Sequence, residues 1–232
     1  MSLNIKQEMK QLTLEMTHLF CDLGLSTWHD SGDISIRDPE TGLIYIDPRP
    51  NKNFRIAPNW KCLTVDDIVV IDIDGNVVDG GKTGDKNPTV EAPMHLCIYR
   101  ARPDCNAIVH SHALYSSVFA SCGEDIPACI VETQLVCKGE IRCAEYGTVS
   151  SVVLGDNIVE ALGEERKAAL LRLHGAVYIG NTIEDAFSVA MYTEKAAQVA
   201  LLARGAGMKL LDTPTTKEGL FDESIFDIID EI

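Results

Sequence analysis

The stretch Ile108-Val109-His110-Ser111-His112 leads from an apolar strand into a pair of histidines. In an extended strand, residues two positions apart point to the same face. The imidazoles of His110 and His112 therefore share a face and can bind one metal ion at the end of the strand. The spacing alone is a weak signal, because two histidines on a strand are often structural or incidental.

Two further residues strengthen the interpretation of a metal site. His174 follows a second apolar, strand-like run and precedes Gly175, and Glu91 opens an expected helix over 90–102. Three histidines with a carboxylate leave one coordination position for a substrate, which is typical of catalytic rather than structural zinc. For His95, one turn after Glu91, support of this site is one alternative, and core packing or solvent exposure is the other.

Strand-like and helix-like patterns extend outward from the histidines. Helical spacing covers 3–23, 90–102, 114–121, 149–162 and 183–204, and strand patterns cover 34–37, 43–46, 68–73, 76–78, 107–112, 168–173 and 177–180. The stretch 123–148 is expected to be loop-rich, with short strands near Cys129 and Ile141. Asp74-Gly75 is a strong hairpin signal. The mixture predicts one α/β domain with a partly antiparallel sheet.

We place the domain at 1–207 and an acidic tail at 208–232. The tail contains isolated apolar residues among acids, so a docked helix and a mobile segment are both open, and the mobile segment is slightly favoured.

The composition limits the class of partner. The 232 residues include 20 basic and 35 acidic side chains, and the net charge of −15 argues against nucleic-acid binding. It still allows one local cationic pocket for an anionic substrate. No apolar run approaches the ~18 residues of a membrane span. The eight cysteines form no C-x-x-C pair and the polar start does not resemble a signal peptide, so we interpret them as buried thiols in a reducing cytoplasm.

Several motifs occur in a characteristic order over about 3–207. They are 31–37, 88–91, 95–104, 110–112, 146–148, 171–175, Gly180 and 184–187. In order and spacing they resemble those of the class II aldolase/adducin family, which includes L-fuculose-phosphate aldolases and L-ribulose-5-phosphate 4-epimerases. The resemblance implies a three-layer α/β/α single domain around a mostly antiparallel sheet, and commonly a homotetramer with active sites between subunits.

The resemblance also assigns roles within the metal site. It implies that His110, His112 and His174 bind Zn²⁺ or another divalent ion, and that Glu91 ligates the resting metal or acts as acid/base. The epimerases of the family tend to carry aspartate at the position of Glu91, so glutamate favours lyase chemistry. Adducin-like domains lack the complete histidine triad, so an enzyme is favoured over a non-catalytic interaction domain.

The substrate-binding positions depart from the sugar-phosphate members, which hold phosphate with a Gly-Asn pair, a Thr-Gly pair and two serines. The corresponding positions here are Gly32-Asp33, Asn59-Trp60 and Thr89-Val90. Asp33 places a carboxylate where phosphate is expected, and two such charges repel. Thr89 and Asn59 retain donor chemistry, whereas Val90 has no donor.

The residues expected to transfer protons also differ from those of the family's aldolases. The aldolases use a tyrosine from a neighbouring subunit, and Val131 falls at that position. Glu132 follows it and is a candidate for a different acid/base.

The sequence therefore predicts a metal-dependent aldolase-type lyase that cleaves a C–C bond beside a carbonyl through a metal-stabilised enediolate. The substrate is expected to be a sugar phosphate or a related small hydroxy-carbonyl compound. A 4-epimerase-like isomerase and a metal-dependent decarboxylase acting on a non-phosphorylated substrate are the alternatives.

Overall fold

A mixed sheet runs through the computed structural model, which describes residues 4–26, 31–49, 59–81, 86–215 and 219. Its strands are β1 (Asp33–Arg37), β2 (Ile44–Ile46), β3 (Val69–Ile71), β4 (Val77–Asp79), β5 (Ala107–Ser111), β6 (Arg142–Cys143), β7 (Ala168–Leu171) and β8 (Gly175–Gly180). Their order is β4-β3-β2-β1-β5-β8-β7-β6. The pairing is antiparallel except between β6 and β7, which are parallel. The sheet is therefore mostly antiparallel, as expected.

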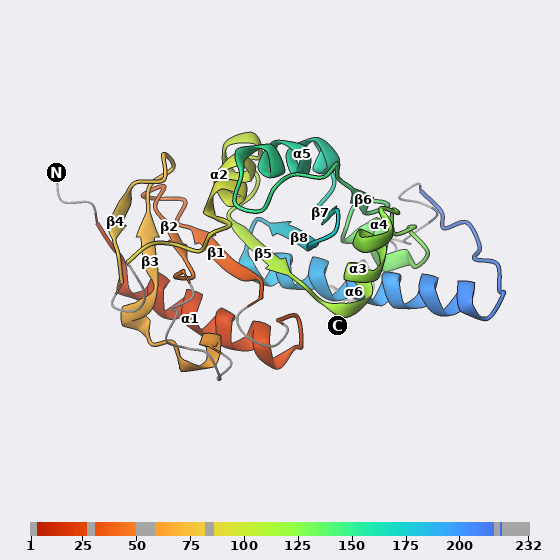
Figure 1. Cartoon of the computed structure of the whole chain (residues 1–232), viewed down its shortest axis with the longest axis horizontal. Helices are drawn as coiled ribbons and strands as arrows, with labels where there is room; N and C mark the ends of the chain where they lie inside the picture. Colours follow the sequence, from red (N-terminus) through yellow and green to blue (C-terminus); the bar gives the residue numbers. More distant parts are fainter. Residues whose placement is uncertain (1–3, 27–30, 50–58, 82–85, 216–218, 220–232) are drawn as a thin grey trace, which may run out of the picture.

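Helices cover both faces of this sheet (Figure 1). They are α1 (Gln7–Asp22), α2 (Ala92–Ala101), α3 (Leu114–Cys122), α4 (Val131–Leu135), α5 (Val152–Leu162) and α6 (Ile183–Gly205), with the short 3₁₀ helices η1 (Asn59–Cys62) and η2 (Val65–Asp67). The buried side chains of α1, α3 and α6 pack on one face of the sheet, and those of α2 and α5 pack on the other. The described chain is thus a three-layer α/β/α domain.

Side chains alternate strictly between the two cores along the central strand. Val109 belongs to the core beneath α1, α3 and α6, whereas its neighbour Ile108 belongs to the core beneath α2 and α5. His110 has the parity of Ile108, since residues two apart share a face of a strand. The first histidine of the pair therefore lies on the α2 side of the sheet.

Local sequence signals explain where several elements end. Thr182 and Asp185 form a reciprocal capping box at the start of α6, as expected from threonine followed by acidic residues. Gly123, in the left-handed conformation at φ 68°, terminates α3. The Asp74-Gly75 hairpin between β3 and β4 is also present.

His174 lies in the turn between β7 and β8, between the two strands that the sequence predicts on either side of it. Two expectations from the sequence need correction. The residues after Cys129 form the helix α4, although a strand forms near Ile141 as β6. All eight cysteines are free thiols, but Cys62 and Cys122 are exposed rather than buried. A thiol is small enough to be tolerated at a surface, so its average preference for the interior decides little at one position.

The tail prediction concerns a part of the chain that is only partly described. Residues 208–215 contain no helix or strand, and Leu210 packs against the core below α6. Residues 216–218 and 220–232 lie outside the described residues, so the docked helix and the mobile segment both stay predictions.

Asp47 is buried where the end of β2 passes beneath α1. Its Oδ1 lies 2.7 Å from the hydroxyl of Thr17, and the backbone N–H of Ile34 donates to its Oδ2 at 2.8 Å. Burial raises the pKa of Asp47 to about 8, and the nearby charge of Asp33 adds to the effect. The Thr17 hydroxyl also lies 2.8 Å from the Thr13 carbonyl. Because a hydroxyl has one proton, a protonated Asp47 that donates to Thr17 satisfies both contacts.

We expect the free energy of unfolding of Asp47→Asn to exceed that of wild type by an amount that grows as the pH rises. The unfolded pKa is about 3.9, so the protonated carboxyl contributes stability that is complete below about pH 4 and is lost as the pH rises through about 8. Asparagine stays neutral, and the variant should gain on the order of 3 kcal/mol over wild type by about pH 8. Urea unfolding at about pH 5 and about pH 8 measures this gain.

The control is Asp74→Asn, because Asp74 is exposed in the β3–β4 turn. Equal pH dependence of the unfolding midpoint in wild type and Asp47→Asn would show that Asp47 is ionised in the folded protein.

Candidate metal centre

Three histidines meet where β5 ends beside the β7–β8 turn. The Nε2 atoms of His110 and His112 lie 3.1 Å apart. The ring of His174 has its centroid 4.9 Å from that of His110 and 4.7 Å from that of His112. One ligand nitrogen from each ring falls within 4.8 Å of the others. This spacing suits three ligands that converge on one ion, and it confirms that the two segments identified in the sequence are brought together.

The protonation state of the three imidazole rings also suits metal binding. Nδ1 of His110 lies 3.0 Å from the carbonyl of Ala176, so an N–H there can donate and leave Nε2 unprotonated toward the other rings. Burial, together with the neighbouring imidazoles, lowers the pKa of each of the three histidines to about 4. All three are therefore neutral at pH 7, which is the form that binds a metal.

Two glycines allow the histidine segments to approach this closely. A Cβ on Gly175 would overlap the carbonyl oxygen of Ser111 and would lie 3.1 Å from the ring of His112. Gly32 has φ +83°, and a Cβ there would overlap the carbonyl oxygen of His110. Leu173 adopts φ 62° directly before His174, a strained conformation of the kind that clusters at functional sites.

Glu91 is the carboxylate that the resemblance implies as a metal ligand or as the acid/base. It caps the N-terminus of α2 and is 3% exposed, and neither carboxylate oxygen makes a hydrogen bond of good geometry with the described residues. Burial raises its pKa to about 7, the charge of Asp33 adds to this, and the backbone of Ser150 opposes it. A buried carboxyl that is poised near neutral pH and has no firm partner is suited to proton transfer or to ligation of an ion.

Asp33 joins a buried polar chain on the α2 side of the sheet. Its Oδ1 lies 2.8 Å from Nε2 of His95, and the hydroxyl of Thr89 donates to its Oδ2 at 2.6 Å. Nδ1 of His95 is in turn 2.7 Å from the hydroxyl of Ser35, which is 2.8 Å from that of Tyr99. Burial alone would raise the pKa of Asp33, but the charge and contact of His95 outweigh it and lower the pKa to about 2.

This carboxylate also connects the chain to the histidines. Asp33 pairs with His110 across β1 and β5, and its charge favours the protonated forms of His110, His112 and His174 against their burial. A fixed negative charge beside the triad favours a cation at that place.

The expected substrate-binding residues are placed less favourably for that role. The single proton of the Thr89 hydroxyl is committed to Asp33, and its oxygen accepts from the backbone N–H of Glu91 at 3.2 Å. Gly32 is closely packed against the His110 backbone. Asn59 begins η1, and its side chain lies outside the described part of the structure.

Glu132 stands on α4 and approaches Lys195 of α6 at 3.7 Å. No contact within the described part of the chain joins it to the histidines, so its role as an acid/base stays a prediction.

Two residues of the site were not identified from the sequence. His95 is fully buried, and its Nε2 lies 2.8 Å from Asp33. Its spacing of one helical turn from Glu91 made support of the site one alternative in the sequence, but did not distinguish it from core packing or exposure. Ser150, at φ 67°, brings its backbone to Glu91 from the loop before α5, and no local pattern in the sequence marks it.

A family model described as the Class II Aldolase and Adducin N-terminal domain matches residues 11–201. The chain belongs to the class II aldolase and adducin family. A 5-deoxy-D-ribulose 1-phosphate aldolase of Bacillus thuringiensis serovar kurstaki is 35% identical over 177 residues, which are 76% of each chain. The L-ribulose-5-phosphate 4-epimerase UlaF of Salmonella paratyphi C is 30% identical over 77% of each chain.

The fold of a solved family member agrees with the architecture described above. A structure of L-fuculose 1-phosphate aldolase is 28% identical and superposes with a TM-score of 0.77 over 100% of this chain and 98% of that one. The family's metal dependence fits the histidine triad, whose donor set of three neutral imidazoles and a nearby carboxylate is suited to zinc or a similar divalent ion. Among the described residues, no helix has the length and apolar character needed to cross a membrane.

Proposed function

We propose that this protein is a metal-dependent lyase that cleaves or forms a C–C bond beside the carbonyl of a small hydroxylated substrate. The observation that carries the proposal is the convergence of three neutral histidines beside a buried carboxylate that lacks a firm partner. The similarity to two sugar-phosphate aldolases supports the same reaction class. Adducin-type binding without catalysis would need neither the triad nor the poised carboxyl.

We assign each residue of the site a separate role in the reaction. His110, His112 and His174 would hold the divalent ion, which when bound acts as a Lewis acid on the substrate carbonyl and an adjacent hydroxyl. Glu91, with its pKa raised to about 7, takes a proton from the substrate and returns it at the carbon where the bond was cleaved. Asp33 keeps His95 and Thr89 in place behind these groups.

Asp33 limits where an anionic group of the substrate can bind. A buried carboxylate with its pKa lowered to about 2 stays ionised at neutral pH, so a phosphate beside it would be repelled. The substrate's anionic group, where it has one, would therefore lie away from Asp33. The relatives named for phosphorylated sugars keep a sugar phosphate among the candidates.

A screen of donor compounds tests the reaction. Dihydroxyacetone and glycolaldehyde, each free and phosphorylated, would be incubated with short aldehydes and the zinc-loaded protein, and products followed by NMR. We expect a product in which a new C–C bond joins the aldehyde to at least one of these donors. A protein that binds metal but neither joins nor cleaves any of these pairs would contradict the lyase proposal.

A 4-epimerase is the second candidate, because the 30% identical UlaF protein is named for that reaction. Epimerisation of a pentulose phosphate can use the same cleavage followed by re-addition of the aldehyde on its other face. Interconversion of L-ribulose 5-phosphate and D-xylulose 5-phosphate without release of aldehyde would establish the epimerase instead of the lyase.

A further inference from the structure

The helix α3 begins two residues after His112, and its own sequence provides no cap for its N-terminus. Ala113 stands at the N-cap position, where its side chain cannot accept a hydrogen bond, and the first turn contains no acidic residue. The first N–H groups of a helix have no partner within the helix, and the helix dipole favours a negative charge beside them. Partners for these groups therefore have to come from another part of the fold.

Glu194 of α6 supplies these partners. The backbone N–H of Ser116 donates to its Oε1 at 2.7 Å, and that of Tyr115 donates to its Oε2 at 3.1 Å. Each carboxylate oxygen thus accepts from a different N–H, and hydrogen bonds to an ionised acceptor are roughly twice as strong as those between neutral groups. Glu194 therefore fixes the start of α3 relative to α6, and with it the chain that leads out of His112.

The other end of α3 contacts the second ligand segment. The backbone N–H of Leu173 donates to the carbonyl of Ala120, in the last turn of α3, at 3.0 Å. Leu173 directly precedes His174, so this bond ties the β7–β8 turn to the helix. One helix therefore joins the segments that carry His112 and His174, whose ring centroids lie 4.7 Å apart.

Three fully buried hydroxyl groups hold the chain on either side of His112. The hydroxyl of Tyr178, on β8, lies 3.1 Å from that of Ser111 and 3.5 Å from that of Ser116. The Ser116 hydroxyl donates to the carbonyl of Ala113 at 3.2 Å. Tyr178 belongs to the core beneath α1, α3 and α6, so these contacts come from the same side of the sheet as Glu194. The backbone around this histidine is thus fixed by several buried contacts, with the carboxylate as their charged member.

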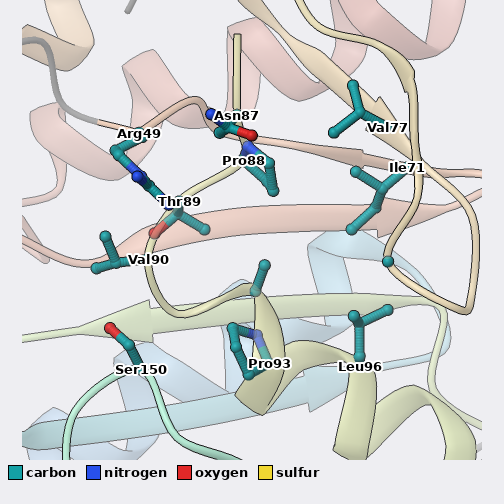
Figure 2. A pocket seen from close by; sticks show the side chains of 12 residues that line it. Arg49, Ile71, Val77, Asn87, Pro88, Thr89, Val90, Pro93, Leu96 and Ser150 are labelled. Carbon is teal, nitrogen blue, oxygen red and sulfur yellow. The ribbon is translucent and has the colours of Figure 1, made fainter. Parts of the chain in front are cut away.

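Glu194 contacts the segment after His112 without lining the pocket beside Glu91. Figure 2 shows Val90, Pro93 and Leu96 among the side chains around that pocket. Among the residues that the structure describes, none of those lining it belongs to α3 or α6. A substitution at Glu194 is therefore expected to affect the metal ligands and to leave this pocket intact.

We propose that Glu194 is a positioning residue of the metal centre, which acts through α3 on His112 and on the turn that carries His174. It fixes the separation of two ligands that come from distant parts of the chain. A ligand set held in place by such supporting contacts binds its ion more tightly than one that must first be ordered. This role rests on the proposed function, because it requires that the histidines bind an ion.

Titration of the metal-free protein with Co²⁺ tests this role without catalysis. The affinity and the visible absorption spectrum of the bound ion, which reports its coordination geometry, would be measured for wild type, Glu194→Ala, Glu194→Gln and Thr182→Ala. Thr182→Ala removes the side-chain cap at the start of α6, so it controls for the loss of a helix cap as such. We expect the affinity to fall about tenfold or more in Glu194→Ala, with an altered spectrum. The loss should be smaller in Glu194→Gln, which keeps one acceptor oxygen, and absent in Thr182→Ala.

The outcomes separate this role from the proposed reaction. A folded Glu194→Ala variant that binds Co²⁺ as wild type does would overturn the role even where lyase activity is found, and so would an equal loss in Thr182→Ala. Metal binding that depends on Glu194 in a protein without lyase activity would retain the role and reject the lyase. Failure of wild type to bind Co²⁺ or zinc would reject the metal site and this role together. Where circular dichroism shows Glu194→Ala to be unfolded, the folded Glu194→Gln variant decides, and an affinity and spectrum equal to those of wild type would overturn the role.

Discussion

Replacing His112 with alanine is expected to weaken divalent metal binding by more than about 100-fold and to abolish the lyase reaction. Loss of a group that merely orients a ligand already costs about 10- to 100-fold in affinity, and His112 would supply a ligand atom directly. Its Nε2 lies 3.1 Å from that of His110, and among the described residues it belongs to the group of three side chains that could hold one ion. Metal content after dialysis against zinc, measured by inductively coupled plasma mass spectrometry, gives the result.

His18→Gln is the matched control, because His18 lies on α1 and is not part of the triad. We expect close to one ion per chain in the wild type and in this control. A His112→Ala variant that keeps its ion would reject the ligand assignment. Failure of the wild type to take up zinc or any other divalent ion would reject the enzyme altogether.

Replacing Glu91 with glutamine is expected to slow the reaction by about 100- to 10,000-fold, the usual contribution of a positioned acid/base. Glutamine keeps the shape of the side chain at the start of α2, but it cannot take a proton. The most direct measurement is exchange of the donor's α-proton with D₂O, followed by NMR, because exchange needs proton removal but no aldehyde. Glu91→Asp retains the carboxyl group on a shorter side chain and should keep part of the exchange.

The control for this experiment is Glu160→Gln, which removes an exposed carboxylate from α5. Metal content is measured in parallel. A Glu91→Gln variant that loses its ion would show that the carboxylate ligates the resting metal. Undiminished proton exchange with the ion in place would show that another group moves the proton, and Glu132 would be the next residue to replace.

Much of this site could be predicted from local patterns. The strand parity that puts His110 and His112 on one face is a property of five consecutive residues, and the structure reproduces it. The capping box at Thr182 and the hairpin at Asp74-Gly75 follow from short-range chemistry as well. Such features need only neighbours in the chain, so the sequence is sufficient.

Other parts of the site depend on contacts between distant segments. His95 is 62 residues from Asp33, counting from the sequence numbers, and only the packing of α2 against β1 and β5 brings their side chains within 2.8 Å. The sequence left His95 open between packing, exposure and support of the site. It marked Thr89 as a donor for substrate, whereas the fold turns its one hydroxyl proton toward Asp33.

By itself, the sequence determined the family, the layered fold and three of the side chains that converge on the candidate metal centre. Periodicity and motif order carry that information, since each depends on residues close together in the chain. Only the tertiary structure decided which polar groups remain available to a substrate. Burial and long-range pairing commit Asp33 and Thr89 to each other and leave the carboxylate of Glu91 without a hydrogen-bond partner of good geometry among the described residues. Availability is a property of the surroundings of a side chain, and those surroundings exist only once the chain has folded.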